Sequence, residues 1–239
     1  MLVRCIHGPE YPEDRAGKRK HKHEKYGKYY GESSLHLWKS VASAKIVGKM
    51  AKRLFIAVDI SADCRDAAAR FAASLRHDLP TTAVRWEHPD KLHLTLKFLG
   101  AVESSQVAAI RDAIVRVVAD VTHFEITILD TGVFPNPRRP RVLWLGVKAG
   151  AKDLSRLAAE IDKNLPKGSF ADEKRGFFPH CTIGRIKGPA SATELAGAIR
   201  DRRFGPISWM VTEVVIYEST LLPTGSVYKA VERIPLLLS

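Results

Sequence analysis

The sequence predicts an α+β protein with two lobes related by an approximate twofold axis. Two observations lead to this prediction. Residues 93–96 (His-Leu-Thr-Leu) and 180–183 (His-Cys-Thr-Ile) are two copies of a His-x-Thr-x pattern, each inside an apolar, strand-like run. From Met50 onward, strand-like runs alternate with amphipathic helical patterns, so that each half of the chain holds one copy. Such an internal duplication indicates two half-sites that meet across one cleft.

The first half opens with a buried strand at residues 54–60. A helix follows, because apolar residues recur at helical spacing from Cys64 to Leu75. The first His-x-Thr-x copy lies in a strand that ends at Gly100, and a second amphipathic helix runs from Val107 to Val117.

The second half begins with two strand-like runs, at residues 123–130 and 141–147, separated by a loop with three prolines. A third helix is predicted from Leu154 to Leu165, and the second His-x-Thr-x copy opens the next strand. Ser191-x-x-Glu194 is a capping box that starts a fourth helix, and residues 209–218 and 227–234 close the chain as strands. Periodicity alone leaves several strand orders open.

Strand geometry places the polar residues of each copy on one face. Successive side chains of a strand point to opposite faces, so His93 and Thr95 share a face while Leu94, Leu96 and Phe98 share the other. The same alternation places Lys97 on the His93 face. His180 and Thr182 repeat the arrangement, and Cys181 points away from the expected cleft, as a core residue would.

This pattern is suited to one kind of chemistry. Two imidazoles on opposite sides of a phosphate can act as general base and general acid in an in-line displacement. The threonine hydroxyls can donate to the non-bridging oxygens, whose charge must be stabilised. A single copy would more often be structural, because Thr favours strands and a lone His often satisfies a local hydrogen bond. Two copies in similar settings favour a phosphodiester-cleaving site that needs no metal.

Residues 1–49 differ from the rest of the chain. They hold 11 Lys and Arg against 5 Asp and Glu, half of the net charge of +12, and they lack amphipathic periodicity. They also lack the apolar core of a secretory signal. One interpretation is a disordered basic arm that helps to bind RNA. The favoured one is an upstream start codon wrongly assigned, because the aperiodic basic sequence ends at Met50, shortly before the first predicted strand; residues 50–239 then form one domain.

Composition is consistent with these expectations. Cys5, Cys64 and Cys181 show no paired spacing, so neither a disulfide framework nor a thiolate metal site is expected. No apolar run approaches the roughly 20 residues of a membrane helix, and we expect a cytoplasmic protein. Residues 50–239 carry a net charge of about +6, which favours a phosphate-bearing partner, although a basic surface is often only solvated.

The chain resembles the two-histidine (2H) phosphoesterases, and among them the RNA 2′,3′-cyclic phosphodiesterases, also called 2′–5′ RNA ligases. The resemblance covers about residues 52–235 and rests on the segments 53–58, 92–100, 132–135, 178–185, 218–219 and 225–228. It implies two antiparallel-rich sheets flanked by helices around a central cleft, with no cofactor and no metal. It also implies that His93 is the proton donor, that His180 is the proton acceptor, and that Thr95, Thr182 and Arg185 bind the phosphate.

The resemblance implies an enzyme that hydrolyses 2′,3′-cyclic phosphate ends of RNA, tRNA fragments among them, to 2′-phosphomonoesters. Reversal of the reaction would give 2′–5′ ligation as a side activity. Phe55, Lys97 and Phe178 are candidate contacts to the RNA, and the two aromatics could instead be core residues. Two alternatives stay open: a 2H enzyme acting on a small cyclic nucleotide or an ADP-ribose cyclic phosphate, and a non-catalytic nucleotide-binding module.

Overall fold

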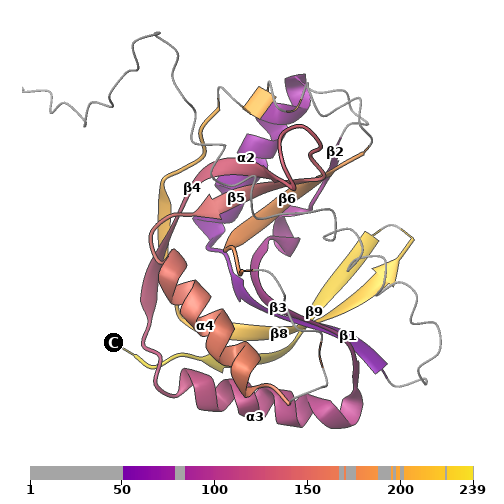
Figure 1. Cartoon of the computed structure of the whole chain (residues 1–239). Coiled ribbons are helices and arrows are strands. Elements are labelled where there is room, and N and C mark those ends of the chain that lie inside the picture. The colour runs from indigo at the N-terminus through magenta and orange to yellow at the C-terminus, as the bar shows by residue number, and fades with distance from the viewer. Residues whose placement is uncertain are drawn as a thin grey trace, which may run out of the picture.

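The computed structural model describes residues 51–78, 84–166, 170, 176–187, 195, 198–199, 202–223 and 225–238. In this part of the chain the strands form one nine-stranded sheet in the order β7-β4-β5-β6-β3-β1-β8-β9, with β2 added beside β6. The pairings between these strands are antiparallel. Figure 1 shows that the sheet curls strongly along its length. The strands are β1 (Ala51–Asp59), β2 (Val84–Trp86), β3 (His93–Glu103), β4 (Phe124–Phe134), β5 (Val142–Val147), β6 (His180–Ile186), β7 (Ile207–Val211), β8 (Glu213–Leu222) and β9 (Gly225–Pro235).

The sheet consists of two halves that are joined at one place. One half is β7-β4-β5-β6 and the other is β3-β1-β8-β9, and the central strands β3 and β6 are paired only through Leu94 and Cys181. The two-lobed α+β architecture is therefore confirmed. The difference from the expectation of two separate sheets is that β3 and β6 join them into one sheet. The halves also exchange strands: β2 pairs with β6, while β8, near the end of the chain, pairs with β1.

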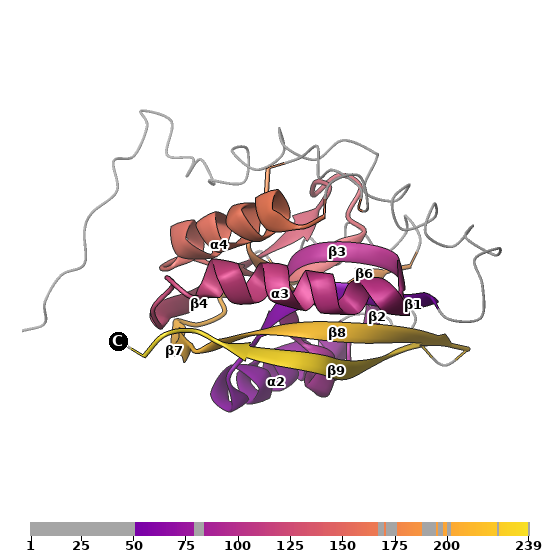
Figure 2. The ribbon, with the colours of Figure 1, turned by 90° about the horizontal axis from the view of Figure 1, so that it is seen from below.

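Helices cover the sheet on both sides. Helix α2 (Ala62–Asp78) contacts the short 3₁₀ turn η3 (Pro89–Lys91) and β7. Helices α3 (Val107–Val118) and α4 (Ala151–Asn164) lie side by side, and α4 contacts β3 (Figures 1 and 2). All three occupy their predicted positions, because apolar residues at helical spacing face the core, among them Leu75, Ile110 and Leu157. Among the described helices, none has both the length and the apolar character needed to cross a membrane.

Two strand predictions need correction. The strand predicted over 209–218 is two strands: the chain leaves β7 at one edge of the sheet and enters β8 in the other half after Thr212. Strand β3 runs past Gly100 to Glu103, because Gly100 adopts a positive φ of 73° that lets the strand continue through an irregularity. The capping box at Ser191–Glu194 and the segment 1–49 lie outside the described residues.

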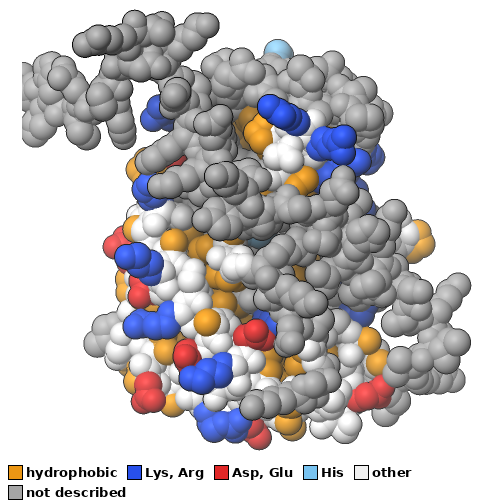
Figure 3. Space-filling model, viewed as in Figure 1, with side chains coloured by type: hydrophobic (Ala, Val, Ile, Leu, Met, Phe, Trp, Pro, Cys, Tyr) orange, Lys and Arg blue, Asp and Glu red, His pale blue; other side chains and the backbone are white. Residues whose placement is uncertain are grey.

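The surface over α3 and α4 carries charges of both signs. Over the lower part of Figure 3, where α3 and α4 lie, Lys and Arg side chains alternate with Asp and Glu. On α4, two ion pairs join residues three positions apart, Asp153 with Arg156 and Glu160 with Lys163. This part of the surface is therefore a solvated helical face. It agrees with the expectation that a basic surface is often only solvated.

Candidate active site

The two His-x-Thr copies meet at the junction of the two half-sheets. Leu94 and Cys181, the middle residues of the copies, are paired across β3 and β6. Because these strands are antiparallel, His93 and Thr95 on one strand flank the same point as Thr182 and His180 on the other, in reverse order. Leu94 and Cys181 are fully buried while the four polar residues are half-buried. The structure thus brings the two predicted half-sites together about an approximate twofold axis.

A bulge after the first copy changes which residues face the cleft. Thr95 pairs with Ala57 but Lys97 pairs with Ile56, so Leu96 is an extra residue and the alternation reverses. Lys97 is only 6% exposed and forms an ion pair of 2.5 Å with Asp162 of α4, on the side away from the histidines. The prediction that Lys97 shares the His93 face is wrong for this reason. Phe98, expected on the opposite face, is 56% exposed and lies near Phe55 on the cleft side.

The second copy carries the same irregularity. Trp144 of β5 pairs with Thr182 and Leu143 pairs with Gly184, so Ile183 is the extra residue. The reversal turns Arg185 to the cleft side, where its Nε donates to Glu87 at 3.1 Å. The residue five positions after each histidine therefore faces the cleft in both halves. This residue is Phe98 in the first half and Arg185 in the second.

Aromatic rings pack against His93. Its ring centroid lies 4.8 Å from Phe55 and 5.5 Å from Tyr228, and Tyr217 stacks on Phe55 at 5.3 Å. Phe55 is only 3% exposed, so it is a core residue and not a surface contact for RNA. Its ring packs against His93 and supports it. The tyrosines come from β8 and β9, which pack beside β1 in this half.

A second aromatic group supports His180. The centroids of Phe134, Phe178 and Trp144 lie 4.9, 6.3 and 6.5 Å from that of His180. The indole of Trp144 crosses Gly132 of the neighbouring strand so closely that a Cβ at this position would come within 2.2 Å of the ring. Phe178 is half-buried and packs edge-on against Trp144 at 5.1 Å, so it belongs to this support.

Backbone carbonyls fix the orientation of both imidazoles. His93 Nδ1 lies 2.7 Å from the Lys91 carbonyl, and His180 Nδ1 lies 2.7 Å from the Phe178 carbonyl. A carbonyl can only accept, so each Nδ1 carries a proton and each Nε2 is the nitrogen left to accept or donate a proton in a reaction. The Nε2 of His93 lies 2.9 Å from the Thr95 hydroxyl, which donates to it when the ring is neutral and accepts from it when the ring is protonated.

The two histidines differ in their electrostatic surroundings. Burial above all, together with the charges of His93 and Arg185, lowers the pKa of His180 to about 4, although its bond to the Phe178 carbonyl opposes the shift. Burial also lowers the pKa of His93, but its bond to Lys91 and the carboxylates of Asp59 and Glu87 oppose that shift. No carboxylate of the described residues acts on His180 in this way, so the two histidines differ in the charges that surround them.

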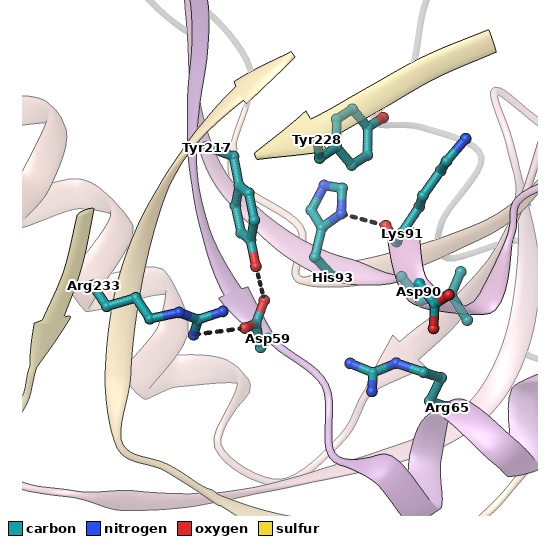
Figure 4. Close-up of a pocket in the computed structure, with 9 residues that line it drawn as sticks. Asp59, Arg65, Asp90, Lys91, His93, Tyr217, Tyr228 and Arg233 are labelled. Atoms are coloured by element: carbon teal, nitrogen blue, oxygen red, sulfur yellow. Dashed lines mark hydrogen bonds and ion pairs between the residues drawn. The ribbon is translucent and has the colours of Figure 1, made fainter. Parts of the chain in front are cut away.

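The cleft beside His93 opens into a pocket of about 200 Å³, shown in Figure 4. Asp59 lies at its wall, where it accepts from the Tyr217 hydroxyl at 2.6 Å and from Arg233 at 3.1 Å. Burial and the bond to Asp59 raise the pKa of Tyr217, so it stays protonated as a donor. Arg65, from the first turn of α2, points into the same pocket.

Among the described residues, the site holds neither a cluster of metal ligands nor a thiol nucleophile. In this part of the chain, no three His, Cys, Asp or Glu side chains come together as a metal site requires. Cys181 is fully buried, and burial raises the pKa of its thiol, which leaves it unreactive at neutral pH. The interpretation of Cys181 as a core residue is confirmed.

Sequence patterns did not assign a role to several residues that surround the histidines. Tyr217 and Tyr228 lie far along the chain from His93, and only the pairing of β8 with β1 brings them to it. Trp144 lies in a predicted strand, but periodicity did not show which strands pair with it. The sequence signal for its packing position is the pair of glycines, Gly132 and Gly146, that flank the indole.

Comparison with known proteins gives consistent matches. The sequence model of the 2′-5′ RNA ligase superfamily matches residues 64–221. The RNA 2′,3′-cyclic phosphodiesterase of Methanothermobacter thermautotrophicus is 36% identical over 184 residues, which cover 77% of this chain and 98% of that protein. The protein of the same name from Thermotoga maritima is 35% identical over 178 residues, 74% of this chain and 91% of the relative.

Solved structures are similar over the same region. A protein of Thermus thermophilus superimposes with a TM-score of 0.65 at 28% identity, covering 77% of this chain and 97% of that one. Escherichia coli LigT, solved in complex with 3′-AMP, gives a TM-score of 0.64 at 28% identity and covers 78% and 98%. The region matched by the superfamily model includes both His-x-Thr copies and the junction between them.

Proposed function

This chain belongs to the 2′-5′ RNA ligase superfamily, and we propose that it hydrolyses 2′,3′-cyclic phosphate ends of RNA to 2′-phosphomonoesters. The observation that carries the proposal is the meeting of two His-x-Thr copies around the Leu94–Cys181 pair, with both reactive Nε2 atoms in one cleft. The names of the relatives, RNA 2′,3′-cyclic phosphodiesterase, support the substrate class.

The electrostatic difference between the histidines supports a direction for the reaction. His180, neutral because its pKa is lowered, removes a proton from a water molecule as the water oxygen attacks phosphorus. The bond from phosphorus to the 3′ oxygen breaks, and protonated His93 supplies the proton that this oxygen needs. Thr95, Thr182 and Arg185 stabilise the charge on the non-bridging oxygens.

Reversal of the same steps joins a 5′-hydroxyl to the cyclic phosphate and gives a 2′–5′ linkage. Water outcompetes RNA ends at ordinary concentrations, so hydrolysis is the main reaction. We further infer a cytoplasmic location and RNA fragments, tRNA fragments among them, as substrates. The two described cysteines, both free and buried, agree with a reducing compartment.

The proposal is tested with an RNA oligomer that ends in a 2′,3′-cyclic phosphate, alongside adenosine 2′,3′-cyclic phosphate and ADP-ribose cyclic phosphate. We expect the oligomer to yield a 2′-phosphomonoester at undiminished rate after prolonged treatment with EDTA, because the two histidines need no metal. Product identity is read by chromatography against authentic 2′- and 3′-phosphates. Turnover of only the small cyclic compounds would favour the alternative substrate class, and binding without turnover would favour a nucleotide-binding module.

The pH dependence tests which histidine is the acid. We expect kcat/KM to rise through about pH 4 as His180 loses its proton. It should fall again on an alkaline limb, centred below the ordinary histidine pKa, as His93 loses the proton it must donate. Asp59→Asn removes a carboxylate that raises the pKa of His93 but not that of His180. The alkaline limb should therefore move to lower pH and kcat/KM at pH 7.5 should fall, while the acid limb stays.

Tyr217→Phe is the matched control, because it keeps the ring stacked on Phe55 and leaves the charge of Asp59 in place. Its alkaline limb should stay close to that of the unaltered protein. If the roles were reversed, kcat/KM at pH 7.5 would depend on the small protonated fraction of His180. Unchanged activity of Asp59→Asn at this pH would then contradict the assignment.

A further inference from the structure

A second pocket adjoins the one beside His93. This outer pocket has a volume of about 250 Å³ and lies along β2, between β6 and the start of β9. Tyr228 and Lys91 line both pockets. Tyr228 also contacts the His93 ring, and the Lys91 carbonyl accepts from His93 Nδ1. A ligand that occupies the catalytic cleft can therefore continue directly into the outer pocket.

The outer pocket is cationic. It is lined by the side chains of Arg85, Lys91 and Arg185, against one carboxylate, that of Glu87. Glu87 already pairs with Arg185, at 3.1 Å. Two positive charges of the three are therefore left without a carboxylate from the described residues that line the pocket.

Arg85 and Arg185 are directly opposite each other in the antiparallel pair of β2 and β6. Like charges at directly opposed positions destabilise a sheet. Arg85 is exposed, and within the described residues its side chain makes no hydrogen bond or ion pair. An anion bound by Arg85 would reduce this repulsion, and a phosphate oxygen pair fits the planar fork of an arginine.

The two arginines lie at different depths from the reacting centre. Arg185 lowers the pKa of both histidines, whereas Arg85 acts on neither and acts on Tyr228. Arg185 lies three residues after Thr182, about 10 Å along a strand. Arg85 is exposed where Arg185 is half-buried, so Arg85 lies on the outer side of Arg185 relative to the histidines.

We propose that the outer pocket binds the last internucleotide phosphodiester of the RNA, with Arg85 as the residue that recognises it. This inference rests on the proposed function and names the polymer end, as opposed to a cyclic mononucleotide, as the preferred substrate. When the cyclic phosphate lies between the histidines, the 5′-phosphate of the same nucleotide is the next anion along the chain. It passes Tyr228 and reaches Arg85.

The test compares adenosine 2′,3′-cyclic phosphate with the dinucleotide that carries the same cyclic end, made with either a phosphodiester or an uncharged methylphosphonate linkage. The unaltered protein should show kcat/KM about tenfold higher on the phosphodiester than on the methylphosphonate, through KM, as expected for loss of one charge-assisted contact. In Arg85→Gln this ratio should fall to about one. Turnover of adenosine 2′,3′-cyclic phosphate should stay within about twofold.

Arg116→Gln, an exposed position on α3 away from both pockets, makes the same change in net charge and should keep the tenfold ratio. Arg85→Lys should recover part of it, because the charge remains without the fork. Equal rates of the unaltered protein on the two dinucleotides would overturn the inference and leave the proposed function intact. So would an equal loss on every substrate in Arg85→Gln. Failure to cleave any of the three compounds would instead count against the proposed function.

Discussion

Replacing His180 with Ala is expected to lower turnover of a cyclic-phosphate RNA end by at least about 10²-fold, the usual contribution of a general base. The reason is geometric: the Phe178 carbonyl holds Nδ1, so the nitrogen left to accept a proton is Nε2. His93→Ala should cause a loss of similar size, because in the proposed mechanism its Nε2 supplies the proton to the leaving oxygen. Both are measured as kcat on an RNA oligomer with a 2′,3′-cyclic end.

The double variant separates catalysis from simple disruption. Residues that act as a unit give non-additive losses, so His93→Ala combined with His180→Ala should lose much less than the product of the single losses. His77→Ala, at an exposed position near the end of α2, is the matched control and should retain full activity. Near-normal turnover in either single variant, with the fold intact by circular dichroism, would contradict the two-histidine mechanism.

The pair of histidines could be found from sequence because the pattern is local. A His-x-Thr-x copy needs only the alternation of one strand to place both polar residues on a face, and the duplication reveals that two such faces exist. The helices were equally predictable, because apolar residues at helical spacing, such as Ile110 and Ile114, show which face is buried.

Predictions that depended on strand regularity or strand order failed or could not be made. The bulge after Thr95 adds a single residue, and that is enough to turn Lys97 to α4 and Phe98 to the cleft. No propensity marks where such a bulge falls, because it depends on the neighbouring strand. Tyr228 and Arg85 reach the cleft region only through pairings between distant segments of the chain.

Trp144→Ala is expected to destabilise the protein by about 3–5 kcal/mol, the usual cost of removing a large buried aromatic side chain. Trp144 is only 6% exposed and contacts Phe134 and Phe178, the rings that also support His180. At Gly132 the strand backbone lies directly against the indole, and a glycine has no side chain to fill the vacated volume. The free energy of unfolding, measured in urea, should therefore show the loss, and activity should fall with it.

Trp144→Phe is the matched comparison for this stability prediction. The buried indole N–H of Trp144 has no hydrogen-bond partner among the described residues, so its removal breaks no hydrogen bond. A smaller aromatic ring still fills most of the space, and the expected cost is about 1 kcal/mol. Equal losses for Ala and Phe would show that the N–H contributes an interaction of its own. A free energy of unfolding within about 1 kcal/mol of the unaltered protein for Trp144→Ala would contradict the prediction, because only a site that relaxes around the cavity avoids the larger cost.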